Sequence, residues 1–244
     1  MKTILKKIQA ALCATIILMA CEKQDASLPK GTLQGTVHLM DEFGNLQNDH
    51  SGVNVTVAGN NPVKTVSTDS EGKFYIHNLS LGTYNFIFQK NGYQEQKVFS
   101  YPFIGGDIPT YFTVSVILSE ISMTTLSNFS IGVKTDGTVD PEKFTELEID
   151  LTSSPESSSE QPRYAVVYIH TASDVSYANY TKRINMGTDS HAVIKLDKLE
   201  AQTTYYAIAY PSPVNCSPYF DPGSETYYYT CYGTPVEIVS FFVE

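Results

Sequence analysis

Apolar and polar residues alternate with a period of two along most of this 244-residue chain from Gly31 onward. The pattern is clear at Val53, Val55 and Val57, and it returns at Phe86 and Phe88. Strict alternation predicts half-buried strands, because successive side chains of a strand point to opposite faces of the sheet. Clusters of Gly, Asn and Pro separate these runs, as turns would. The sequence therefore predicts an all-β fold of many short strands, typical of β-sandwiches.

The alternation continues to the end of the chain. A run at residues 111–119 is expected to close a first sandwich, and the later strand-like runs fall at residues 147–151, 164–170, 192–196, 204–210 and 236–243. Two stretches rich in Pro with Gly or Ser, residues 101–109 and 152–162, are expected to be loops, and residues 140–144 offer one helical turn at most. We predict two consecutive β-sandwich domains, at residues 31–120 and 121–244.

The first 20 residues have a different pattern. Lys2, Lys6 and Lys7 precede 13 uncharged residues, 8–20. A membrane-spanning helix needs about 20 apolar residues, whereas a basic start, a short apolar core and small residues before a cut site are typical of a secretory signal peptide. We therefore interpret residues 1–20 as a signal peptide.

The sequence Leu-Met-Ala-Cys that ends at Cys21 resembles a bacterial lipobox. This resemblance implies that Cys21 becomes the lipidated N-terminus and that residues 21–30 form a tether. Several acyl chains hold a protein on a bilayer almost permanently. The acidic stretch at residues 22–25 resembles the surface-export signal of Bacteroidota lipoproteins. The expected location is the outer membrane, with the protein facing the cell surface, although a periplasmic orientation stays open.

The net charge of the chain is −10, and removal of the three signal-peptide lysines takes the mature chain to −13. An acidic protein repels phosphate backbones, so nucleic acid is excluded as an expected partner. Anionic lipid headgroups should also repel this acidic chain, so we expect the protein to associate with the membrane through its lipid anchor.

Cys216 and Cys231 are the cysteines that remain beyond the signal peptide and the lipidation site. Asp221, Pro222, Gly223 and Ser224 lie between them, and Pro followed by Gly at the centre favours a type II turn. A hairpin folded there would place the two cysteines opposite each other. Because export permits disulfides, we predict a Cys216–Cys231 bridge rather than a metal site, for which nearby histidines are missing.

An ordered set of residues in the first half resembles the carboxypeptidase regulatory-like domain. The set comprises residues 35–37, 52–57, 68–76, Leu79, 82–84 and 92–93, and it covers residues 31–119. The resemblance implies a small transthyretin-like β-sandwich that serves as an accessory module. It does not imply peptidase activity, because the zinc ligands of the enzyme belong to a separate catalytic domain.

Leu199, Thr203 and Tyr205 resemble the signature of a fibronectin type III-like module, or more generally of an immunoglobulin-like sandwich. The resemblance implies a tyrosine corner, in which the ring of Tyr205 covers the edge of the core and its hydroxyl bonds upstream backbone.

The chain carries none of the common catalytic motifs, and its five histidines show no ligand spacing. Glu146, Glu148 and Asp150 are expected on the solvated face of a strand. Oxygen ligands gather at Asp41, Glu42, Asn45 and Asp49, where Ca²⁺ binding is conceivable but a solvated loop is the simpler interpretation. We therefore expect no enzymatic activity, no cofactor and no metal.

Six aromatic residues surround the predicted disulfide hairpin, namely Tyr219, Phe220, Tyr227, Tyr228, Tyr229 and Tyr232. They could form a contact surface, since tyrosine is favoured at interface hot spots and stacks on sugar rings. They could equally pack the hairpin onto its sandwich.

Together these features predict a non-catalytic binding or scaffolding accessory at the outer-membrane surface. Its expected partners are outer-membrane proteins or carbohydrate, within a nutrient (glycan) uptake system. The alternative is a structural pilus or adhesion subunit, and a hydrolase with an unrecognised site is the last candidate.

Overall fold

The structure is a computed structural model that describes residues 29–60, 62–134 and 144–244. Every regular element in these ranges is a strand, which confirms the predicted all-β fold. The strands are β1 (Lys30–Met40), β2 (Asn54–Ala58), β3 (Lys64–Ser67), β4 (Lys73–Ser80), β5 (Gly82–Gln89), β6 (Gln96–Phe103), β7 (Thr110–Tyr111), β8 (Val116–Ser119), β9 (Thr125–Val133), β10 (Phe144–Ser154), β11 (Tyr164–His170), β12 (Lys182–Gly187), β13 (His191–Asp197), β14 (Thr203–Ser212), β15 (Tyr219–Asp221), β16 (Thr226–Tyr228) and β17 (Val239–Val243).

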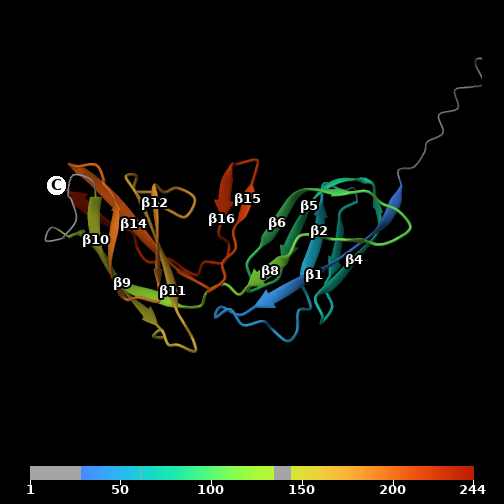
Figure 1. Ribbon diagram of the computed structural model, residues 1–244, viewed down its shortest axis with the longest axis horizontal. Helices are drawn as coiled ribbons and strands as arrows, with labels where there is room; N and C mark the ends of the chain where they lie inside the picture. Colours follow the sequence, from blue (N-terminus) through green and yellow to red (C-terminus); the bar gives the residue numbers. More distant parts are fainter. Residues whose placement is uncertain (1–28, 61, 135–143) are drawn as a thin grey trace, which may run out of the picture.

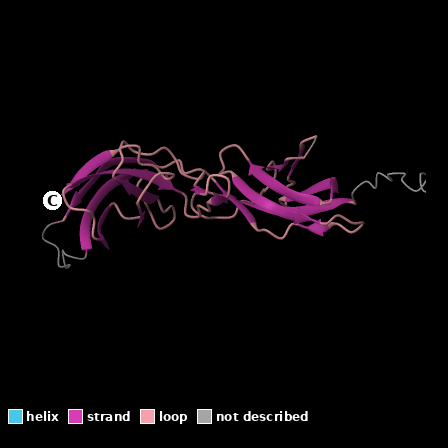
Figure 2. Cartoon of the chain, turned by 90° about the horizontal axis from the view of Figure 1, so that it is seen from above, coloured by secondary structure: helices cyan, strands magenta, loops and turns pink. Residues whose placement is uncertain are grey.

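The strands form two sandwiches that lie one after the other along an elongated molecule (Figures 1 and 2). In the first, a sheet of order β4-β1-β7, with β8 also paired to β1, faces a sheet of order β3-β2-β5-β6. Alternating residues of both sheets point inward and form one core, which includes Leu33, Val55, Phe74 and Phe86. The Phe74, Phe86, Phe88 and Phe112 rings lie edge-on or tilted to one another, the geometry that aromatic cores prefer.

In the second sandwich, a sheet of order β13-β10-β9 faces a sheet of order β12-β11-β14-β17. Its core is separate from the first and includes Leu147, Ile149, Val167 and Phe241. One sheet has three strands and the other has four. The first strand of the domain, β9, pairs with the second, β10, and the last strand, β17, pairs with β14. This is the arrangement of an immunoglobulin-like sandwich. The predicted boundary at residues 120 and 121 falls between the two cores, and the exact domain limits stay a prediction.

The predicted tyrosine corner is present. The hydroxyl of Tyr205 accepts a hydrogen bond of 3.0 Å from the backbone N–H of Glu200, five residues upstream. Its ring is buried and stacks on Phe241, with 5.6 Å between ring centroids. The corner therefore fixes the approach to β14 against the end of β17.

Three local predictions differ from the structure. Residues 101–103 belong to β6, because Pro102 lies on the edge strand of its sheet, where proline is tolerated. The run at residues 111–119 is not one continuous strand but is divided between β7 and β8. Both strands pair with β1, where Thr110 lies opposite Leu33 and Val116 lies opposite Val37. The chain therefore advances six residues where β1 advances four, and the extra length leaves Val114 exposed. The second loop begins only after Ser154, where β10 ends. The single helical turn predicted at residues 140–144 lies outside the described residues, except for Phe144, which begins β10.

Candidate binding surface at the domain junction

The hairpin of β15 and β16 stands between the two sandwiches (Figure 1). Its strands pair Tyr219 with Tyr228 and Phe220 with Tyr227. The predicted type II turn is wrong, because Gly223 does not adopt the positive φ that this turn requires, whereas Glu225 does, at +52°. The carboxylate of Asp221 instead accepts the N–H of Gly223 at 2.8 Å, which folds the chain into a longer loop.

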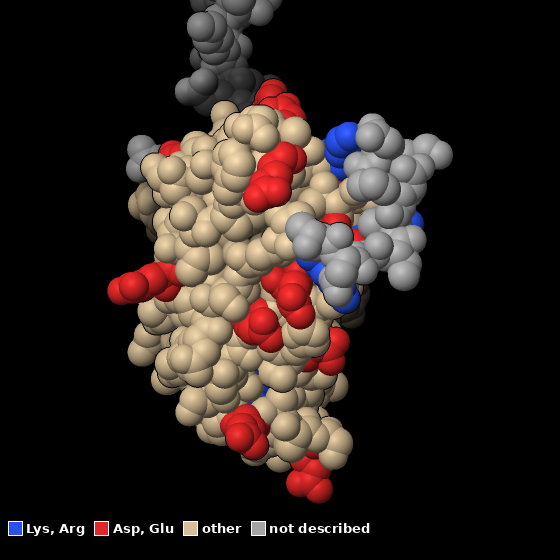
Figure 3. All heavy atoms as spheres, turned by 90° about the vertical axis from the view of Figure 1, so that its left-hand side faces the viewer, with Lys and Arg blue, Asp and Glu red and all other residues tan. Residues whose placement is uncertain are grey.

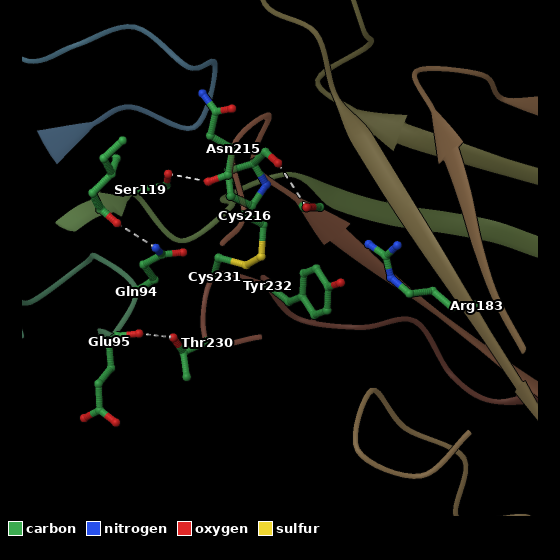
Figure 4. Close-up of a disulfide and its surroundings, with 12 residues drawn as sticks. Gln94, Glu95, Ser119, Arg183, Asn215, Cys216, Thr230, Cys231 and Tyr232 are labelled. Atoms are coloured by element: carbon green, nitrogen blue, oxygen red, sulfur yellow. Dashed lines mark hydrogen bonds between the residues drawn. A yellow bond between two sulfur atoms is a disulfide. The ribbon is translucent and has the colours of Figure 1, made fainter. Parts of the chain in front are cut away.

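The predicted disulfide is present and closes this excursion at its base. Cys216 and Cys231 have Cα atoms 5.7 Å apart, a distance in the normal range for a disulfide. Cys231 is fully buried, and its carbonyl accepts the N–H of Ser122, from the segment between the sandwiches, at 3.2 Å. Next to the bridge, the Ser119 hydroxyl donates to the carbonyl of Asn215 (Figure 4). The residues at the disulfide are therefore hydrogen-bonded to the first sandwich and to the segment that connects the two sandwiches.

Tyr219 packs against the first sandwich and is buried. Its hydroxyl donates to Glu95 Oε1 at 3.2 Å, and Lys97 Nζ lies 5.1 Å from its ring centroid. Burial raises the pKa of the Tyr219 hydroxyl, so it stays a neutral donor. Thr230, on the other side of the hairpin, donates to the backbone carbonyl of Glu95 at 2.8 Å (Figure 4). Glu95 thus holds the hairpin from two sides.

Tyr232 packs inward against the second sandwich. Its hydroxyl lies 2.7 Å from that of Tyr168, and its ring stacks almost parallel on Tyr229, 5.2 Å between centroids. Arg183 Nε donates to the Tyr168 hydroxyl at 3.2 Å and its guanidinium lies over the Tyr229 ring. Burial raises the pKa of Tyr232 and of Tyr168 above the ordinary value for tyrosine. This cluster is internal packing, so Tyr232 is not available to a partner.

Two of the remaining aromatics of the hairpin, Phe220 and Tyr227, face outward. Phe220 is 44% exposed and Tyr227 is 55% exposed, and their ring centroids lie 5.1 Å apart as a cross-strand pair. Tyr228 is half-buried and stacks on its cross-strand partner Tyr219, with 5.4 Å between ring centroids, as Tyr229 stacks on Tyr232. Of the six predicted contact residues, Tyr219 and Tyr232 therefore brace the junction, while Phe220 and Tyr227 form the exposed surface.

A shallow polar hollow of about 260 Å³ lies next to the hairpin, on the first sandwich. It is lined by Asn54, Gln89, Lys90, Asn91, Tyr93 and Glu95. Burial, together with the neighbouring carboxylate of Glu120, raises the pKa of Tyr93 to about 12. Sequence reasoning missed this hollow, because its lining comes from two strands and a turn with no shared motif.

The loop considered for Ca²⁺ uses its oxygens for other contacts. Asp41 Oδ1 accepts the N–H groups of Phe43 and Asn45, and Asp49 Oδ1 accepts that of Ser51. Glu42 pairs with Arg163 of the second sandwich at 2.7 Å. Within the described ranges, no three His, Cys, Asp or Glu side chains gather closely enough to hold a metal ion.

The acidic face predicted on β10 is largely exposed and is partly paired. His191 Nδ1 lies 2.8 Å from Asp150 Oδ1, and its Nε2 lies 3.9 Å from Glu148. At the end of the molecule formed by the second sandwich, acidic groups outnumber basic ones on the visible surface (Figure 3). This distribution agrees with a chain of net charge −10.

Cys21 and the predicted signal peptide lie outside the described residues. Among residues that the structure does describe, no helix is long and apolar enough to cross a membrane.

Residues 32–152 match the model of the carboxypeptidase regulatory-like domain, the family that the first half of the sequence resembles. The match continues past the first sandwich into β9 and β10. No curated protein matches the chain.

Several solved structures are similar at low identity. A chain of a cohesin-X-dockerin complex from Acetivibrio cellulolyticus is 20% identical to this chain, with a TM-score of 0.31. The match covers 38% of this chain and 60% of the solved chain. A DUF3823 family protein from Bacteroides ovatus is 12% identical over 88% of this chain and all of its own, with a TM-score of 0.29. A Bacteroides uniformis protein described as a candidate carbohydrate binding protein is 13% identical over 86% of this chain and 99% of its own, with a TM-score of 0.28. At these scores none of them transfers a function to this chain.

Proposed function

We propose that this protein is a non-catalytic cell-envelope lipoprotein, anchored through Cys21, that acts as a binding or scaffolding accessory at the outer-membrane surface. The shape of the molecule supports this proposal. β1 begins at Lys30, at the end of the molecule remote from the second sandwich (Figure 1). An anchor preceding Lys30 would hold the first sandwich next to the membrane and let the junction and the second sandwich project from it.

The exposed pair Phe220 and Tyr227 is the observation that carries the binding role. The two rings sit on a hairpin that a disulfide closes and that Tyr219 and Thr230 fasten to Glu95. A surface held rigid before binding loses little conformational entropy when a partner docks. Aromatic side chains dominate binding energy at interfaces and stack on sugar rings, so the pair suits an outer-membrane protein or a carbohydrate.

The polar hollow beside the hairpin supports the uptake role. Amide, ammonium, hydroxyl and carboxylate groups meet in it, and these groups hydrogen-bond sugar hydroxyls. Glu95 links the hollow to the hairpin, because its side chain lines the first and binds the second.

Membrane fractionation tests the anchor. Cys21→Ser should move the protein from the outer-membrane fraction to the soluble fraction, while Cys216→Ser should leave it in the membrane. Retention of Cys21→Ser in the membrane would contradict the proposal.

Affinity electrophoresis in gels containing soluble glycans tests the binding surface. A glycan ligand should retard the wild-type protein and the Phe242→Ser control, in which a similarly exposed ring of the second sandwich is removed. The Phe220→Ser/Tyr227→Ser variant should run faster than both. Equal retardation of all three proteins would show that the rings do not contact the glycan.

A further inference from the structure

The end of the first sandwich where the described chain begins carries exposed apolar side chains. Ile104 and Ile108 are 72% and 82% exposed, in the loop between β6 and β7, and Leu81, in the turn between β4 and β5, is 39% exposed. The sandwich leaves most of the surface of both isoleucines uncovered. Apolar groups gathered on one surface normally mark a contact with a partner or a membrane.

This apolar end is held directly against the start of the chain. The N–H of Leu81 donates to the carbonyl of Pro29 at 2.7 Å, and the N–H of Gly106 donates to the carbonyl of Lys30 at 3.3 Å. A Cβ on Gly31 would lie only 2.8 Å from the carbonyl oxygen of Gly106, so the two backbones approach more closely than other residues allow. The loop therefore presents its isoleucines from a fixed position beside the point where the tether joins.

The length of chain between this point and the anchor limits where the sandwich can sit. Eight residues, 21–28, connect the lipidation site to Pro29. Even fully extended, they span at most about 28 Å. The tether therefore keeps the apolar end of the sandwich close to the bilayer surface.

The charge at this end does not oppose such a contact. Lys30 and Asp107 are both exposed there and carry opposite charges. The mature chain as a whole is acidic, so attraction to anionic headgroups is not the driving force. Insertion of apolar side chains at the boundary between headgroups and acyl chains remains favourable, as it does for interfacial segments.

We propose that Ile104, Ile108 and Leu81 insert into the interfacial region of the bilayer that carries the anchor. This insertion would orient the molecule on the membrane. The proposal rests on the lipid anchor of the proposed function. The apolar end would thus contact a lipid surface, and burial of its apolar side chains would drive the contact. Contact should therefore depend little on ionic strength and should not require anionic lipid.

The absence of tryptophan from the sequence allows a direct test. Ile108→Trp places a single tryptophan, which can be excited selectively over the tyrosines, at the apolar end of the lipidated full-length protein. The matched control is Met123→Trp, because Met123 is 81% exposed but lies between the sandwiches. Both proteins are bound to phosphatidylcholine vesicles that carry bromine on their acyl chains, which quenches tryptophan at short range.

The I108W protein should show blue-shifted emission and lose most of its fluorescence to the bromines, at low and at high salt. The M123W protein should keep both its emission maximum and its intensity. If both proteins float with the vesicles but I108W is quenched no more than M123W, the membrane contact is refuted and the anchor stands. If neither floats, the anchor is refuted and the contact that rests on it is refuted too.

Discussion

Arg163 Nη1 donates to Glu42 Oε1 at 2.7 Å, and this ion pair joins the second sandwich to the first. The side chains are only 6% and 12% exposed, respectively. Glu42 Oε2 also accepts the hydroxyl of Ser122 and the N–H of Met123, in the segment between the sandwiches, at 3.1 Å each. The pair therefore fixes the two domains and their connection at one point.

Removing one partner of this pair should destabilise the protein strongly. Glu42→Gln leaves the Arg163 charge buried without its counterion, which typically costs about 3 kcal/mol of unfolding free energy. Chemical denaturation should show this loss, while Glu160→Gln, in an exposed loop, should change stability by less than about 0.5 kcal/mol. Similar values for the two variants would mean that the ion pair does not hold the junction.

Reduction of Cys216–Cys231 should lower the melting temperature of the purified protein. The bridge closes a loop with a sequence separation of 15, worth about 3 kcal/mol in the chain-entropy model. Because the hairpin also contacts the first sandwich, hydrogen exchange at β6 should increase on reduction. An unchanged melting temperature would show that the bridge contributes no stability.

The inward and outward aromatics of the hairpin should behave differently on substitution. Tyr219→Phe removes the hydrogen bond to Glu95 and should cost about 1 kcal/mol of stability. Phe220→Ser/Tyr227→Ser alters exposed rings and should leave stability within about 0.5 kcal/mol of wild type. Thermal denaturation of both variants measures the contrast. A large loss in the double variant would instead assign Phe220 and Tyr227 to internal packing.

Stability should fall when the pH drops below about 6.5. His50 Nδ1 accepts the N–H of Leu39 at 3.0 Å, which requires an unprotonated nitrogen. Burial, with the nearby His38 ring, lowers the pKa of His50 below its value of 6.5 in the unfolded chain. Protonation therefore favours unfolding: the contribution is complete above pH 6.5 and is lost as the pH falls through the folded-state pKa.

The matched variant for this pH effect is His50→Gln, which keeps an acceptor but does not titrate. Its melting temperature should fall less steeply than that of the wild type between pH 6.5 and pH 5. Parallel curves would show that His50 is not the titrating group.

Much of the fold could be predicted from local pattern. Residues 164–170 form a continuous apolar run that coincides with β11, and the offset from Leu199 to Tyr205 predicted the tyrosine corner. Both features depend on neighbours within a few residues. The turn between β15 and β16 could not be predicted from Pro-Gly alone, because the side chain of Asp221 competes for the N–H of Gly223.

The role of the hairpin could not be predicted in the same way. Glu95 and Tyr219 are 124 residues apart, and Glu42 and Arg163 are 121 apart. Neither pair has a sequence signature, since a Glu in a turn is normally solvated. Only the tertiary arrangement separates Tyr219 and Tyr232, which brace the junction, and the half-buried Tyr228 and Tyr229, which stack on them, from Phe220 and Tyr227, which are free to bind.

Cross-linking in intact cells, followed by pull-down of the lipidated protein, tests the central claim most directly. The wild type and Phe242→Ser should recover an outer-membrane barrel or glycan-binding lipoproteins, and Phe220→Ser/Tyr227→Ser should lose them. Equal recovery by all three proteins, or recovery of the protein itself in a detergent-resistant ladder, would contradict the account. The ladder would indicate a structural pilus or adhesion subunit instead.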